Sequence, residues 1–138
     1  MQPPHTERKF IGMWIYYNPN PAGRNVGDCS VRAISAALNI DWEAAYDMLC
    51  TAGYNMCDMP NSNEVWGAVL RQHGFYRDII PDVCPDCYTT ADFCQDHPFG
   101  VYVLSFNGHV ATVVDGDIYD TTDISRDIPH YYWYLKEV

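Results

Sequence analysis

The sequence predicts an α+β domain in which helices of the first half pack on an antiparallel sheet from the second half. Capped segments with apolar residues at helical spacing fill residues 28–74, whereas short strand-like segments separated by turns fill residues 99–136. The 138 residues, 48% of them hydrophobic, are enough for one core of ordinary size. We therefore expect a flexible arm over residues 1–9 and a single domain over residues 10–138.

The chain is expected to begin with a strand and then to enter its first helix. Residues 10–17 are rich in aromatic side chains, which favour strands, and the prolines and glycines of residues 19–27 indicate a loop. Asp28 is a good N-cap residue, and apolar side chains then recur at helical spacing. We therefore place Cys29 in the first turn of this helix.

Two more helices are predicted before residue 75. Asp41 can cap the second helix, which is expected to stop at Gly53. Asn61, with Glu64 three residues later, can start the third helix, which should end at Gly74. The first half of the domain is thus expected to be mainly helical.

Strands and one short helix are predicted for the second half. Thr89 and the residues that follow it are typical of a helix cap, and Pro98 must come after the end of that helix. Asp115 and Gly116 indicate a two-residue β-hairpin turn, because both residues tolerate positive φ. The expected strands are residues 75–80, 99–106, 109–114, 117–122 and 131–136, the last of them at a sheet edge.

Composition excludes several classes of function. The formal net charge is −10 and only eight residues are Lys or Arg, so the chain lacks the cations that bind a nucleic-acid backbone. It has no apolar run long enough to span a bilayer, and residues 1–9 do not have the layout of a signal peptide. We therefore expect a cytoplasmic protein with no nucleic-acid or membrane partner, whose six cysteines are reduced thiols.

Cys29 is the strongest candidate for a functional residue. A thiol at the start of a helix lies beside unpaired backbone N–H groups and at the positive end of the helix dipole, which favours the nucleophilic thiolate. A small buried thiol on a helix face would fit the same sequence. The functional interpretation therefore depends on a suitable base elsewhere in the chain.

His109 and Asp120 are expected to supply that base and its orienting carboxylate. If the predicted turn joins Val114 directly to Asp117 across the hairpin, counting back along both strands makes His109 and Asp120 diagonal neighbours on one face. Asp117 and Asp123 would point to the other face. The sequence therefore predicts a nucleophile, a base and an orienting acid, in that order along the chain.

A cysteine that starts the first core helix, followed by a histidine and an acid on adjacent strands, resembles the order found in papain-like cysteine peptidases. More narrowly, NVGDCSVRA at residues 25–33 and GHVATVVDGDIYD at residues 108–120 resemble a small papain-like group encoded in bacteria and their phages. The resemblance covers residues 16–134 and implies a papain-like fold. It also implies that Cys29 is the nucleophile, His109 the general base and Asp120 its orienting residue.

The resemblance further implies an oxyanion-hole side chain before the cysteine, commonly a glutamine in peptidases of this type. Gly23 stands at that position in this chain. Asn25 is the nearest amide, and Asn20 and Asn18 lie farther back in the same loop. The backbone N–H of Cys29 can donate as well, so the sequence predicts an oxyanion hole that depends on one of these amides and on backbone donors.

Cys84, Cys87, Cys94 and His97 have a spacing that could close a tetrahedral zinc site. Their pattern, C-x2-C-x6-C-x2-H, supplies four ligands of the types that zinc prefers. The same residues also fit the buried face of a short helix next to a proline-bounded turn. Such a zinc ion would be structural, because the chemistry expected at Cys29 requires no cofactor.

Two functions are compatible with these residues. The first is a cysteine hydrolase or acyltransferase that attacks a peptide, isopeptide or other acyl bond of a protein or peptide substrate. The second is a catalytically weak or inactive papain-like scaffold that binds a protein, for example a phage-encoded inhibitor of a host factor, through the aromatic residues at 16–17 and 131–134. Either would act inside a bacterial or phage-infected cell, and the fold alone does not decide between them.

Overall fold

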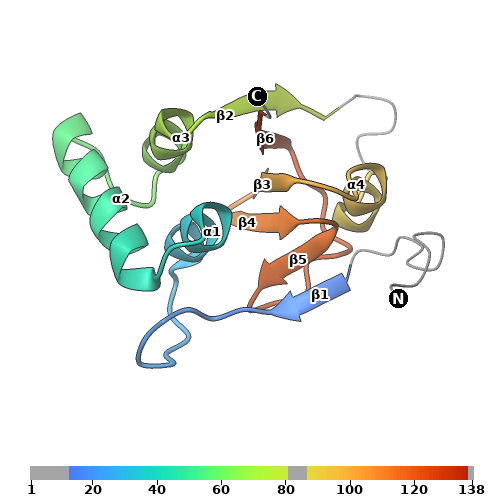
Figure 1. Ribbon diagram of the computed structural model, residues 1–138, viewed down its shortest axis with the longest axis horizontal. Helices are drawn as coiled ribbons and strands as arrows, with labels where there is room; N and C mark the ends of the chain where they lie inside the picture. Colours follow the sequence, from blue (N-terminus) through green and yellow to red (C-terminus); the bar gives the residue numbers. More distant parts are fainter. Residues whose placement is uncertain (1–12, 81–86, 137–138) are drawn as a thin grey trace, which may run out of the picture.

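The computed structural model describes residues 13–80 and 87–136, and these form four helices and six strands around one mostly antiparallel sheet (Figure 1). The α+β class is therefore confirmed, while the predicted arm over residues 1–9 lies outside the described residues. In chain order the elements are β1 (Met13–Tyr16), α1 (Cys29–Leu38), α2 (Trp42–Met56), α3 (Asn63–Gln72), β2 (Phe75–Ile79), α4 (Thr90–Asp96), β3 (Val101–Phe106), β4 (His109–Val114), β5 (Asp117–Asp120) and β6 (Tyr131–Leu135).

The strands follow the order β1-β5-β4-β3-β6-β2, and only β1 pairs in parallel, with β5. The prediction that residues 131–136 form an edge strand is wrong, because β6 lies between β3 and β2. Trp133 is buried among the helices on one face of β6, and Tyr132 packs against the cluster on the other face. A strand that packs on both faces is better placed inside a sheet than at its edge.

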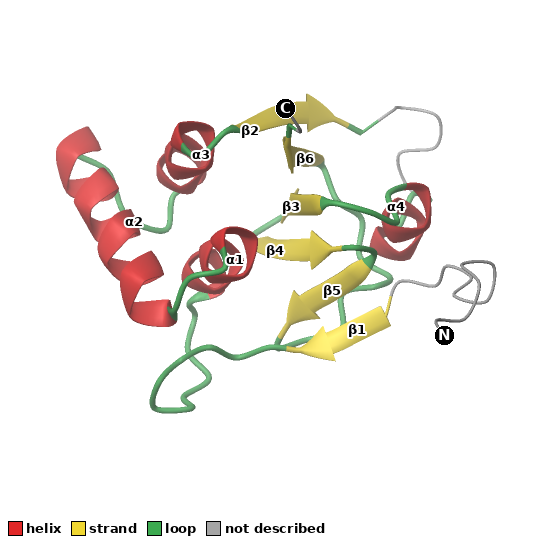
Figure 2. Cartoon of the chain, in the orientation of Figure 1, coloured by secondary structure: helices red, strands yellow, loops and turns green. Residues whose placement is uncertain are grey.

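The two faces of the sheet are covered by different helices, and Figure 2 shows α4 apart from the other three. Val103 and Val110 belong to the core cluster that contains residues of α1, α2 and α3. Their strand neighbours Leu104 and Ala111 belong to a second cluster with Phe93 of α4. Because successive side chains of a strand point to opposite faces, β3 and β4 form the shared floor of both cores.

The observed helix ends agree in part with those predicted from the sequence. Thr89 makes the predicted capping box with Asp92 at the start of α4. The cap of α3 is Ser62 rather than Asn61, and its side chain accepts a hydrogen bond from Val65 N. The predicted stop at Gly53 is wrong, because α2 continues to Met56.

Gly53 is required for close packing rather than for ending the helix. A Cβ atom at this position would lie 2.9 Å from the carbonyl oxygen of Asp58, a contact that side chains do not make. The helix ends instead at Cys57, which adopts the left-handed conformation at φ 56°. Glycine thus lets the turn after α2 fold back onto the helix.

The β4–β5 hairpin has the predicted register. Asp115 and Gly116 both adopt positive φ, and Val114 pairs with Asp117 as expected. β5 ends at Asp120, somewhat before the predicted boundary. Since His109 begins β4 and Asp120 ends β5, both residues lie at the same end of the hairpin.

Within the described residues, none of the helices combines the length and the apolar character that a membrane span requires.

Candidate active site

Cys29 is the first residue of α1 and is half-buried. The N-cap residue before it, Asp28, makes no side-chain hydrogen bond to the first turn of the helix. The carboxylate of Asp28 instead accepts hydrogen bonds from Arg32 and Trp42. The thiol therefore stands at a helix start whose N–H groups are not capped by the residue that would ordinarily cap them.

His109 and Asp120 form the diagonal pair that the hairpin count predicts. The distance from Nε2 of His109 to Oδ2 of Asp120 is 2.6 Å, and the Asp120 side chain is fully buried. Strand β1 and the residue after it hold the backbone of Asp120, because Trp14 Nε1 of β1 and the backbone N–H of Tyr17 both donate to its carbonyl oxygen. The orienting carboxylate is thus fixed by the strand on either side of it.

The imidazole of His109 also contacts Cys29. Hydrogen-bond interactions with the His109 side chain and with the backbone N–H of Val110 both act to lower the pKa of the Cys29 thiol. Because Nε2 is occupied by Asp120, Nδ1 is the ring nitrogen left to face the sulfur. The three predicted residues are therefore in contact, in the order Cys29, His109, Asp120.

The protonation equilibria follow from these contacts. Burial by itself raises the pKa of the Cys29 thiol, but hydrogen bonding and charge from His109, with smaller effects of Val110 and Arg32, bring that pKa below its usual value. The hydrogen bond to Asp120, followed by that to Cys29, raises the pKa of His109 to about 9. The arrangement thus favours the thiolate form of Cys29 beside an imidazolium.

Asp120 is held in its charged form. Burial works to raise the pKa of its carboxyl group, but the hydrogen bond and charge of His109 outweigh burial. Arg32 and the backbone N–H of Thr121 act in the same direction, so the pKa lies below its usual value.

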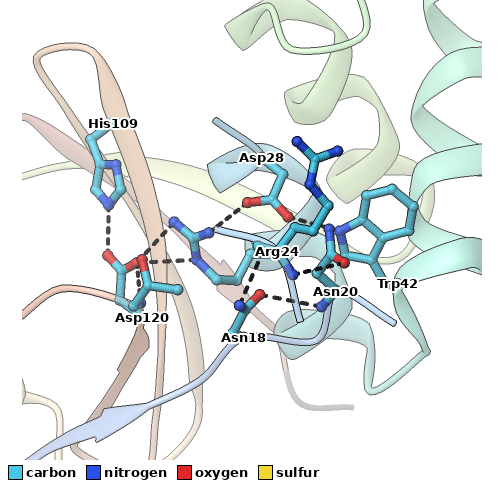
Figure 3. Close-up of polar contacts among 9 residues, drawn as sticks. Asn18, Asn20, Arg24, Asp28, Trp42, His109 and Asp120 are labelled. Atoms are coloured by element: carbon cyan, nitrogen blue, oxygen red, sulfur yellow. Dashed lines mark hydrogen bonds and ion pairs between the residues drawn. The ribbon is translucent and has the colours of Figure 1, made fainter. Parts of the chain in front are cut away.

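A buried polar chain extends this site into the helices, and sequence reasoning missed it (Figure 3). Arg32 donates to Asp120 on one side and to Asp28 on the other. The second oxygen of Asp28 accepts from Trp42 Nε1 at 2.8 Å. The i, i+4 spacing of Asp28 and Arg32 is the one sequence feature that could have indicated part of this chain.

The loop before α1 is held by its own asparagines. Asn20 Oδ1 accepts from Ala22 N and Arg24 N, and Asn18 Nδ2 donates to the carbonyl of Arg24. Gly23 closes a turn at φ 69°, a conformation that a glutamine would adopt only with strain. The loop geometry thus accounts for glycine at this position.

The oxyanion-hole assignment stays a prediction for all three asparagines. The side chains of Asn18 and Asn20 contact the loop backbone, as Figure 3 shows. Asn25 is exposed.

A cleft of about 370 Å³ lies beside the start of α1, and sequence reasoning did not identify it. Its walls come from the loop before α1, the first turn of α1, α2 and the turn before α3. The lining is mostly apolar and includes Val26, Val31, Trp42, Tyr46, Leu49 and Met59, and Arg24 contributes a cation.

The predicted zinc ligands are found in different settings. Cys84 lies outside the described residues, and Cys87 is disulfide-bonded, which corrects the expectation that all six cysteines are reduced. Cys94 is buried in the α4 core, and His97 Nδ1 contacts the carbonyl oxygen of Phe93. No cluster of three or more potential metal ligands is found in residues 13–80 and 87–136. The zinc site therefore stays a prediction, and Cys87 in its disulfide form offers no thiolate ligand.

Comparison with known proteins found no matching family model, curated relative or solved structure.

Proposed function

We propose that the protein is a papain-like cysteine hydrolase or acyltransferase, with Cys29 as nucleophile, His109 as general base and Asp120 as orienting residue. The observation that carries this proposal is that the imidazole of His109 bridges Asp120 and the thiol that begins α1. Nucleophile, base and orienting acid in mutual contact are the requirements of covalent acyl transfer.

In the first step, the Cys29 thiolate attacks an acyl carbonyl carbon and forms a carbon–sulfur bond, and the carbonyl oxygen becomes an oxyanion. The intermediate collapses when the bond to the leaving group breaks. His109 donates the proton from Nδ1 to the departing amine or alcohol, so the products are a thioester on Cys29 and the free leaving group.

In the second step, water or an amine attacks the thioester while neutral His109 accepts its proton. The carbon–sulfur bond then breaks, and the sulfur leaves as the thiolate beside imidazolium. Water yields hydrolysis and an amine yields transfer. Asp120 keeps its hydrogen bond to Nε2 throughout, so the ring does not rotate between the two steps.

The oxyanion needs donors, and the start of α1 supplies them. Because the Asp28 side chain makes no cap bond, the N–H groups of the first helical turn, including that of Cys29, are open to an incoming anion. Loss of one side-chain donor at such a site costs about 10²–10³ in rate. We therefore expect a working but slow enzyme unless an asparagine of the loop contributes.

The cleft beside α1 favours a substrate with an apolar group next to the reacting acyl bond. Gly27 and Asp28, which directly precede Cys29, form part of its wall, and the aromatic rings of Trp42 and Tyr46 stack there at a centroid distance of 4.8 Å. An apolar side chain of a peptide would bury its surface against these rings.

A second candidate is a protein-binding module on the same scaffold, and the exposed residues of β1 favour it. Met13, Trp14 and Tyr16 are 59%, 40% and 61% exposed on an edge strand of the sheet. Exposed apolar side chains on a sheet edge are typical of surfaces that receive a partner.

Activity-based labelling tests the enzyme proposal. The wild type, Cys29→Ala and Cys57→Asn are treated with a panel of peptide and ubiquitin-like acyl electrophiles, and adducts are located by mass spectrometry. Cys57 is an exposed thiol in a left-handed conformation that asparagine tolerates, so its variant is the matched control.

We expect one electrophile class to label Cys29 rapidly in the wild type and in Cys57→Asn, with the label absent from Cys29→Ala. Equal and slow labelling of every free thiol by the whole panel would contradict the enzyme proposal and leave the binding module as the better account.

A further inference from the structure

Arg32 is shared between two buried carboxylates, a feature that the triad by itself does not require. Its Nη1 lies 2.8 Å from Asp28 Oδ1, whereas Nε and Nη2 lie 3.1 and 3.0 Å from Asp120 Oδ1. Arg32, Asp28 and Asp120 are 4%, 7% and 0% exposed, so water screens little of their interaction. Every charge in this group therefore affects its neighbours strongly.

The charges in this group do not balance. One guanidinium faces two carboxylates, which leaves a surplus of one negative charge. Were Arg32 paired with Asp120 alone, its charge would cancel that of the carboxylate that faces His109. Instead, Asp28 accepts a hydrogen bond from one nitrogen of the guanidinium through Oδ1. Trp42 Nε1 donates to the second oxygen of Asp28 and holds the carboxylate in place.

We propose that Asp28 is a positioning residue that acts through Arg32: by drawing the guanidinium partly away from Asp120, it leaves Asp120 enough negative charge to hold a proton on His109. This inference rests on the proposed function, because that proton is the one His109 gives to the leaving group. It assigns a role to the residue before the nucleophile that neither the triad nor helix capping supplies.

The geometry of the helix start supports this role. Asp28 occupies the N-cap position, where an aspartate ordinarily bonds to the backbone of the first turn, yet it makes no such bond. Asp41, the N-cap of α2, makes that bond to Ala44 N at 2.8 Å. At the start of α1, the ion pair of Asp28 with Arg32 thus takes the place of capping. The backbone N–H groups of the first turn, which begins at Cys29, are left open.

Few other charges face the same imidazole within the described residues. Cys29 and Asp120 are the titratable groups that act on His109, and Arg32 of α1 acts on both of those groups. Trp14 of strand β1 and the backbone N–H of Tyr17, directly after that strand, donate to the carbonyl oxygen of Asp120 and carry no charge. Asp28 is therefore the group through which the Arg32–Asp120 contact can be adjusted.

The test is the titration of the His109 ring, followed by NMR of the imidazole nitrogens and assigned with His109→Gln. It is carried out in a Cys29→Ala background, so that the thiol does not contribute. Asp28→Asn removes the charge with little change of shape. Asp28→Ser removes the charge and supplies a good N-cap, which supports folding. Asp41→Asn is the matched control, because it changes an N-cap aspartate that does not touch Arg32.

We expect both Asp28 variants to weaken proton binding by His109 about threefold or more, and Asp41→Asn to leave it unchanged. An unchanged titration in Asp28→Asn and Asp28→Ser, with the fold intact, would overturn the inference. If the role of Asp28 were merely structural, its substitution would lower the urea midpoint of unfolding and leave the titration of His109 unchanged.

The outcome is separable from that of the proposed function. The titration does not use Cys29 or any substrate, so its failure would leave acyl labelling of the wild type standing. Absence of acyl labelling would contradict the enzyme proposal, while the effect of Asp28 on the proton of His109 would still be measured.

Discussion

Cys29 and Cys94 both lie on helices that pack against the sheet, but on opposite faces, and their thiols have opposite properties. Cys29 begins α1, and contact with His109 holds its pKa below the usual value. Cys94 lies late in α4, where burial, followed by the charge of Asp117, raises its pKa to about 12. The difference indicates that the neighbours of a helical cysteine, rather than the helix alone, set the pKa of its thiol.

The histidines near these two thiols differ in the same way. His109 contacts a buried carboxylate through Nε2. His97 contacts the carbonyl oxygen of Phe93 through Nδ1, and its ring stacks on that of Phe93 at a centroid distance of 3.9 Å. A carbonyl oxygen carries no formal charge, so His97 packs beside a neutral acceptor, whereas His109 faces a carboxylate.

The largest expected effect is a difference in alkylation rate between the two thiols. With iodoacetamide at pH 7 we expect Cys29 to react at least about 10²-fold faster than Cys94, because the thiolate is the reactive form and Cys94 is almost entirely protonated. Peptide mapping by mass spectrometry measures both rates in one sample.

Unfolding serves as the control for that comparison. In concentrated urea the two thiols lose their surroundings and should react at similar rates. A rate for native Cys29 no higher than that for exposed Cys57 would contradict the electrostatic account.

The second effect concerns stability on the two faces. Asp120→Ala leaves Arg32 without one of its buried partners, and we expect it to lower the free energy of unfolding by about 3–5 kcal/mol. Tyr88→Phe removes an exposed hydrogen bond to Asp96 beside α4 and should cost about 1 kcal/mol or less. Urea denaturation at pH 7 measures both, and equal losses would show that the polar chain is no more important than a surface contact.

The third effect is a pH dependence. Asp120 gives the largest contribution to the raised pKa of His109, so the imidazolium stabilises the fold fully below pH 6.5, its ordinary pKa, and this stabilisation is lost as the pH rises through the folded-state pKa. The pKa of Cys29 is lowered, so its thiolate contributes stability that increases with pH, in the opposite direction to the contribution of His109. A Cys29→Ser background removes the opposing contribution.

The Cys29→Ser variant should have a higher free energy of unfolding than the double variant Cys29→Ser/His109→Gln. This difference should shrink as the pH increases from 6 to 9.5. Urea midpoints across this range provide the measurement. An advantage that grows with pH would contradict the assigned direction.

The smallest effect is expected from His97→Gln. It removes a stacked ring from the α4 face, and we expect a loss of about 1 kcal/mol and no change in the alkylation rate of Cys29. A slower Cys29 in this variant would mean that the two faces of the sheet are coupled.

The sequence by itself determined the hairpin and the helix start. A two-residue Asp115-Gly116 turn fixes the pairing of its strands, and alternation along each strand then brings His109 to Asp120. Likewise, an aspartate before an apolar helical pattern located the first turn and placed Cys29 in it. These features are local, so patterns of a few residues are sufficient to specify them.

Only the tertiary structure decided what Asp28 and Arg32 contact, where β6 lies in the sheet and how β1 secures Asp120. Sequence predicted Asp28 as a cap, whereas its carboxylate binds Arg32, which also reaches Asp120 from 88 residues away. Such contacts form because burial leaves a charged side chain no water to bind, so it must find a partner of opposite charge wherever packing brings one. That requirement acts through space rather than along the chain, which is why local patterns did not reveal it.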